Sequence, residues 1–178
     1  MQQKNKPHTC CFFGHRKIEE TTTLTETLFR AVENLIVTKN VDTFLFGSKS
    51  AFNDLCHKTV TALKEKYPHI RRIYVRAEFP NISEDYKSYL LQSYEDTYFP
   101  PQMINAGNAV YVERNRTMID NSDYCVIYYD EGYAPPSKKR RKADLTSYQP
   151  KSGTKLAFDY AAKKGSKIIN IRKGNKTI

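Results

Sequence analysis

Residues 9–16 of the chain read TCCFFGHR, a short and mostly apolar run that ends in Gly14, His15 and Arg16. An apolar run bounded by glycine is typical of a strand that is buried on both faces of a sheet. An arginine at the end of such a strand can bind phosphate or carboxylate through two parallel hydrogen bonds. The stretch therefore predicts a first strand followed by one part of an anion site. The alternative is that Arg16 pairs with a nearby acid such as Glu19, while His15 caps a helix.

Short apolar runs alternate with helical segments along the rest of the chain. Apolar residues recur at helical spacing between the runs, and glycine or proline interrupts the pattern at the ends of the segments. Strands that alternate with helices predict a single-domain, Rossmann-like α/β fold with a doubly wound, mainly parallel sheet and a core over about residues 9–171. The further expected strands are 43–46, 72–76, 124–129 and 167–171, and the expected helices are 24–38, 50–67, 83–94, 110–121 and 153–164. Residues 99–101 (FPP) predict an extended turn.

Two further clusters follow strands or open helices. Gly47 and Ser48 end the second strand, Asn53 follows one turn later, and residues 152–154 (Ser152, Gly153 and Thr154) open the last helix. In an open parallel sheet these junctions lie on one edge, and free N–H groups at helix starts attract anions. The clusters therefore predict one crevice that binds phosphate. Simple helix capping by the serines is the alternative, and the spacing of a Walker phosphate loop is absent.

The expected helix 110–121 is rich in charge. Glu113 and Arg116 stand three residues apart, and Arg116 and Asp120 four apart, so these side chains can pair with one another on a solvated surface. Alternatively they line a polar cleft. In that case Arg114 or Arg116 would supply a second cation for an anionic ligand.

Half of the net charge of +10 lies in one segment, because residues 134–152 carry six basic residues and one acid, a net of +5. This segment lies in an expected basic loop, 130–152, that would be a nucleic-acid patch, a nuclear-import-like run, a lid over the crevice or a plain solvated loop. Its central residues are Lys138, Lys139, Arg140, Arg141 and Lys142.

The histidines, cysteines and apolar stretches of the chain argue against a metal site, disulfides and a membrane span. The four histidines lack the spacing of metal ligands, so we expect no metal site, and nothing in the sequence indicates a cofactor. The four cysteines lie in or beside apolar runs, as buried free thiols of a reducing compartment do. No stretch is apolar for long enough to cross a bilayer, and no secretory signal opens the chain. We therefore expect a cytoplasmic protein that does not enter the membrane.

Four motifs occur in order along the chain: CCFFGHR at 10–16, FGS at 46–48 with FNDL at 52–55, ERNR at 113–116 with MID at 118–120, and YQPKSGT at 148–154. Together they resemble the YpsA-type branch of the SLOG superfamily, a group named for the Smf/DprA DNA-uptake proteins and the Lonely-Guy phosphoribohydrolases. The resemblance implies a Rossmann-like domain that holds a nucleotide or nucleotide derivative at the first glycine turn and at the late Gly-Thr turn. Related SLOG proteins commonly form dimers, so a homodimer is one assembly that the resemblance allows.

One departure from the superfamily concerns catalysis. Lonely-Guy enzymes carry Pro-Gly-Gly-x-Gly-Thr followed closely by a catalytic glutamate, whereas residues 150–159 here read PKSGTKLAFD. The glycine and threonine match, but Asp159 lies one turn too far along. Hydrolysis of an N-glycosidic bond needs a carboxylate. Glu113 or Asp120 would have to supply it.

Three hypotheses follow. The first is a cytoplasmic sensor or carrier of a nucleotide-derived ligand, in which Arg16 and residues 152–154 hold phosphate, and Gly47, Ser48 and Asn53 line the sugar or base. The second is a nucleoside-monophosphate N-glycosidase that uses Glu113 or Asp120. The third is a DprA-like nucleic-acid-binding protein that relies on the basic loop.

Overall fold

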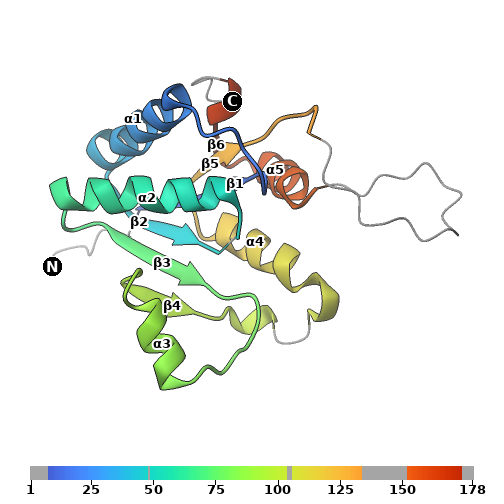
Figure 1. The fold of residues 1–178 in the computed structure, drawn as a ribbon. Helices are drawn as coiled ribbons and strands as arrows, with labels where there is room; N and C mark the ends of the chain where they lie inside the picture. Colours follow the sequence, from blue (N-terminus) through green and yellow to red (C-terminus); the bar gives the residue numbers. More distant parts are fainter. Residues whose placement is uncertain (1–7, 48, 104–105, 134–151, 174–178) are drawn as a thin grey trace, which may run out of the picture.

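A computed structural model describes residues 8–47, 49–103, 106–133 and 152–173. Its centre is one six-stranded sheet in the order β4-β3-β2-β1-β5-β6, in which every neighbouring pair is parallel (Figure 1). The expected Rossmann-like α/β fold is thereby confirmed. The strands are β1 (His8–Gly14), β2 (Val41–Phe46), β3 (Arg71–Val75), β4 (Asp96–Tyr98), β5 (Tyr124–Tyr128) and β6 (Lys167–Asn170).

Helices cover both faces of the sheet, as a doubly wound topology requires. Helices α1 (Thr22–Lys39) and α2 (Ala51–Lys66) pack side by side on one face. Helices α4 (Val110–Asp120) and α5 (Gly153–Lys163) pack together on the other (Figure 1). The remaining helical segments are α3 (Glu84–Leu90) before β4, and the short 3-10 turns η1 (Pro101–Met103), η2 (Gly107–Ala109) and η3 (Ile171–Lys173).

The structure differs from the sequence-based expectation mainly at the β3–β4 end of the sheet. The expected helix 83–94 stops at Leu90, and β4 forms just before the turn that was expected at 99–101. Strand β4 has three residues, of which only Thr97 is buried. A short edge strand needs no continuous apolar run, so hydrophobic periodicity gave no signal for it.

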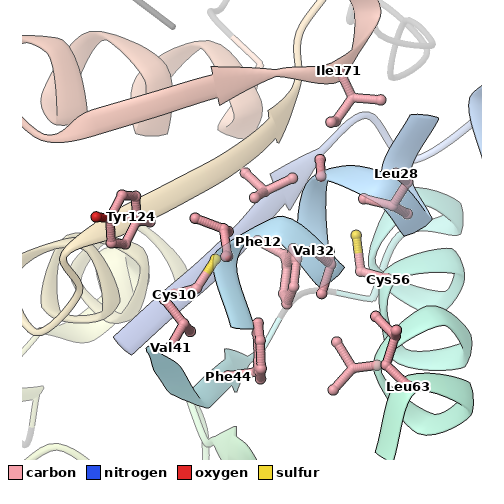
Figure 2. Close-up of a cluster of buried hydrophobic side chains, with 14 of the residues drawn as sticks. Cys10, Phe12, Leu28, Val32, Val41, Phe44, Cys56, Leu63, Tyr124 and Ile171 are labelled. Atoms are coloured by element: carbon pink, nitrogen blue, oxygen red, sulfur yellow. The ribbon is translucent and has the colours of Figure 1, made fainter. Parts of the chain in front are cut away.

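The core explains why β1 is apolar from Cys10 to Phe13. Alternate residues of a strand point to opposite faces. Cys10 and Phe12 accordingly lie in the cluster beneath α1 and α2, while Cys11 and Phe13 lie in the cluster beneath α4 and α5. Figure 2 shows the first cluster, in which the rings of Phe12 and Phe44 stack with their centroids 5.9 Å apart. The four cysteines are free and buried, as expected, with Cys10 and Cys56 in the first cluster and Cys11 and Cys125 in the second.

Candidate functional site

The strand order places a topological switch point between β1 and β5. Strands β2, β3 and β4 follow on one side of β1, and the chain then returns to place β5 and β6 on the other. In open α/β sheets the crevice at the carboxyl ends of the two strands that flank such a point is the usual ligand site. The loop after Gly14 and the segment after Tyr128 meet there. The first candidate motif therefore lies at the edge that the topology favours.

Gly14 is required by the close approach of α2. A side chain at this position would overlap the ring of Phe52, which belongs to the first turn of that helix. The backbone N–H of Ala51 also donates a hydrogen bond to the carbonyl of Arg16, across 3.0 Å. Helix α2 therefore holds the loop after β1 in place, while the side chain of Arg16 stays exposed.

His15 is enclosed between the loops that follow β1 and β5. Its ring is 2% exposed and stacks on Tyr133, with the centroids 3.9 Å apart. Its Nε2 accepts a hydrogen bond from the backbone N–H of Asp130, across 2.9 Å. Burial lowers the pKa of His15, which favours the neutral ring, so its proton lies on Nδ1. Among the described residues that Nδ1 has no hydrogen-bond partner.

Arg114 is a buried cation beside Gly47. Its side chain is 5% exposed, and its guanidinium donates to the carbonyl of Gly47 and to Oδ1 of Asn115, the latter across 3.0 Å from Nη2. Burial lowers the pKa of Arg114. None of the described carboxylates forms an ion pair with it. A Cβ at position 47 would lie 2.9 Å from the Arg114 side chain, so glycine there makes room for the cation.

Asn53 lies in the first turn of α2, next to the loop of Arg16. Ser50 caps the helix by accepting a hydrogen bond from the Asn53 N–H across 3.1 Å. The Asn53 side chain is 3% exposed, and its Oδ1 accepts no hydrogen bond from any residue that the structure describes. Ser48, the other candidate from this motif, lies outside the described residues.

The start of α5 has the features of an anion site. Ser152 caps the helix by accepting a hydrogen bond from the N–H of Lys155 across 3.1 Å, and the first turn holds no acid. The positive end of the helix dipole is therefore not compensated by a side chain of that turn. Gly153 is exposed, and no atom of the described residues lies within 4 Å of where its Cβ would be. Thr154 is buried. Gly153 and Arg116 line the same small hollow between α4 and α5.

The two candidate catalytic carboxylates lie at different ends of α4. Glu113 pairs with Arg116 across 2.7 Å in the first half of the helix, near the carboxyl edge of the sheet. Asp120 is the last residue of α4 and pairs with Lys164 across 3.0 Å. Because α4 runs back towards the start of β5, Asp120 lies at the amino edge. The structure therefore places Glu113, Arg114 and Arg116 nearer the carboxyl edge of the sheet and leaves Asp120 away from it.

Sequence reasoning did not select a cleft at the ends of β3 and β4. It has a volume of about 490 Å³, and its walls include Glu78, Phe79 and Tyr111. The signal that could have found it was the rule used for the other strands, since residues 76–80 directly follow β3 and belong to the same edge. Asp130 and Tyr133 were also missed, although they follow β5 in the same way.

Several expectations concern residues or ions that the structure does not place. Lys138, Lys139, Arg140, Arg141 and Lys142 lie outside the described residues, as does most of the expected loop 130–152. Within the described ranges, no group of three or more His, Cys, Asp or Glu side chains is arranged to hold a metal ion. Over the same residues, none of the helices combines the length and apolarity that crossing a bilayer demands.

A parallel sheet wound on both faces, with glycine turns and cations along its carboxyl edge, defines a Rossmann-like α/β protein. Comparison with protein-family models finds a match over residues 5–158 to the YpsA model, described as the YspA SLOG family. The chain therefore belongs to the YpsA family of SLOG proteins, and the resemblance seen in its four motifs is confirmed. No curated protein matches the chain.

Proposed function

We propose that this protein is a cytoplasmic sensor or carrier that binds a nucleotide or nucleotide derivative at the carboxyl edge of the sheet, around the β1–β5 switch point. The observation that carries the proposal is Arg114. Glu78 attracts the charge of Arg114 only from beyond ion-pair distance, and no described carboxylate contacts the guanidinium, so its burial is costly unless something closer compensates the charge. The negative charge of a bound nucleotide would do so.

The neighbouring groups suggest how such a ligand would lie. The guanidinium of Arg16 is suited to phosphate because it carries a fixed positive charge. The first turn of α5, residues 152–154, is suited as well, because it has the positive end of the helix dipole and no acidic side chain. The unpartnered Oδ1 of Asn53 is an acceptor and the unpartnered Nδ1–H of His15 is a donor. A sugar hydroxyl can satisfy either group, which supports a ribose close to Gly47.

The two alternative functions depend on fewer residues. An N-glycosidase would rely on Glu113, because Asp120 lies at the opposite edge and pairs with Lys164. Substitution Glu113→Gln should then abolish turnover and leave binding nearly intact. A nucleic-acid-binding protein would rely on residues 138–142, and its affinity should fall steeply as salt rises.

The first test identifies small molecules that the purified protein carries. Protein is denatured, and the released compounds are analysed by mass spectrometry for wild type, Arg16→Ala and Arg30→Ala. Arg30 is an exposed arginine on α1 that pairs with Glu26 and lies away from the sheet edge, so it is a matched control. We expect a nucleotide from wild type and from the control, and its loss from Arg16→Ala.

A titration then measures affinity. The released compound, or a panel of nucleoside mono- and diphosphates, is titrated calorimetrically into the same three proteins. Loss of about one charge-assisted hydrogen bond at Arg16 should weaken binding by roughly tenfold or more. A wild-type protein that carries no nucleotide, and that no nucleotide binds or stabilises against heat, would overturn the proposal and favour a nucleic-acid role for residues 138–142.

A further inference from the structure

The cleft at the ends of β3 and β4 shares no lining residue with the loops after β1 and β5, and it lies on the same edge of the sheet. Its volume of about 490 Å³ is within the range of small-molecule sites, roughly 300–1,000 Å³. Its apolar walls come from Phe79, Phe99, Met103 and Val110. The polar groups at its mouth are the carboxylate of Glu78 and the hydroxyl of Tyr111.

The loop that forms one wall is held in a strained conformation. Phe79 has a left-handed backbone (φ 58°), which a bulky residue rarely adopts, and its side chain is 66% exposed. Arg76 braces the loop by donating from Nη1 to the carbonyls of Phe79 and Pro80, across 2.7 and 3.2 Å. Strain that surrounding contacts maintain is a feature of ligand-binding loops. Here it presents a large aromatic ring at the mouth of the cleft.

Helix α4 presents a second ring, Tyr111, to the cleft, and the loop residue Glu78 supplies a hydrogen-bond acceptor. Tyr111, which is 51% exposed, donates its hydroxyl proton to Oε1 of Glu78. Oε2 of Glu78 accepts no hydrogen bond from the residues that the structure describes. The guanidinium of Arg114 lies over the Tyr111 ring, 5.6 Å from its centroid. The cleft therefore combines aromatic surface with one free carboxylate oxygen, and a buried cation lies close behind it.

We propose that this cleft binds a nucleobase that carries an exocyclic amino group, with its ring against Phe79 and Tyr111 and its amino group donating to Oε2 of Glu78. Aromatic side chains stack on any base, so the two rings contribute affinity, and the carboxylate determines which bases are preferred. A carboxylate accepts from an amino group and repels a carbonyl oxygen at the same position. Adenine and cytosine therefore fit, while hypoxanthine and uracil do not.

The charge of Arg114 argues for a neutral ring over an organic cation. Aromatic walls with one carboxylate also suit an alkylammonium ion. The guanidinium over Tyr111 repels such a cation, however, and its charge already attracts the carboxylate of Glu78. A volume of about 490 Å³ is also generous for a small ammonium group.

The position of the cleft agrees with one continuous ligand, and this part of the inference rests on the proposed function. Strand β3 is two positions from β1 in the sheet, which is about 10 Å. Gly47, at the end of β2, lies between them. A base in the cleft, a ribose near Gly47 and a phosphate towards Arg16 would follow the sheet edge in that order.

The test compares bases that differ only at the amino position. Adenosine and inosine monophosphates, and cytidine and uridine monophosphates, are titrated calorimetrically into wild type, Glu78→Gln and Glu65→Gln. Glu65 is an exposed acid near the far end of α2 and serves as the matched control. Wild type and control should bind the amino-bearing member of each pair about tenfold more tightly. Glu78→Gln should lose most of that preference, because an amide donates as well as accepts.

The nucleosides without phosphate and the variant Arg16→Ala separate this inference from the proposed function. Arg16→Ala should weaken all four nucleotides equally and keep the base preference. If the four nucleotides bind equally well and Glu78→Gln changes nothing, the base does not bind in the cleft. That result would overturn this inference and leave the proposed function standing. Adenosine that binds through Glu78 while no nucleotide gains affinity from its phosphate would support the cleft and overturn the phosphate site. Tetramethylammonium that binds through Glu78 in place of the bases would overturn the choice of ligand.

Discussion

The Nε2 atom of His15 accepts a hydrogen bond from the backbone N–H of Asp130 across 2.9 Å, between residues 115 positions apart in the chain. This bond joins the loop after β1 to the loop after β5, the two strands that flank the switch point. Tyr133 stacks on the imidazole and completes the link. The width of the central crevice thus depends on a titratable ring that is neutral when the bond is formed.

The His15 link predicts that stability falls in mild acid. Burial lowers the pKa of His15 in the folded protein, so the unfolded chain, with an ordinary value of about 6.5, takes up the proton first. Because the unfolded state binds more protons below that pH, the free energy of unfolding decreases as the pH falls from about 6.5 towards the folded pKa. Thermal denaturation between pH 7.5 and 5 measures the loss.

The variant His15→Asn is the control for that prediction. Its melting temperature should be lower at pH 7.5 and should depend less on pH over the same interval. His69→Asn, which alters an exposed histidine in the turn after α2, should keep the wild-type slope. An equal pH dependence in wild type and His15→Asn would show that another group is responsible.

The variant Gly14→Ala should destabilise the fold. The added methyl group would overlap the Phe52 ring, and overpacking of this kind typically costs about 1–3 kcal/mol. Chemical denaturation measures the difference in the free energy of unfolding. A second variant, Gly14→Ala with Phe52→Leu, should recover part of the loss relative to Phe52→Leu alone. No loss in Gly14→Ala would contradict the packing role that we assign to this glycine.

The variant Gly153→Ala should separate stability from ligand binding. Nothing among the described residues lies within 4 Å of the added methyl group, and alanine is a better helix residue by up to about 1 kcal/mol. The melting temperature should stay the same or rise slightly. If phosphate approaches the backbone here, the methyl group should weaken nucleotide binding in calorimetric titration. Unchanged affinity would place the phosphate elsewhere on the edge.

The variant Arg114→Met should weaken nucleotide binding by roughly tenfold or more, since a charge-assisted contact contributes about 1.5–3 kcal/mol. Its effect on folding combines two opposing changes. The carbonyl of Gly47 and the amide of Asn115 lose a donor, while the cost of burying an unpaired charge disappears. We therefore expect a melting temperature close to that of wild type. Full nucleotide affinity in this variant would remove the observation on which the proposed function rests.

Strand β4 and the end of the helix before it are the parts of the fold that hydrophobic patterns did not predict. Buried central strands such as β1 and β5 are apolar along their length because helices cover both faces, so the runs at 9–13 and 124–129 predicted them directly. Strand β4 lies at the edge and buries only Thr97. The helix before it ends at Leu90, which shortens the segment that the periodicity indicated.

The sequence by itself determined the parallel α/β fold, the family and the edge at which Gly14, Gly47 and Gly153 lie, because hydrophobic periodicity and strand-to-helix turns are local properties. Only the tertiary structure decided which side chains share a site there. The direction of α4 separates Asp120 from Glu113, and the packing of distant loops gives His15 its partner Asp130 and Tyr111 its partner Glu78. Such contacts join residues far apart in the chain, so no local pattern encodes them.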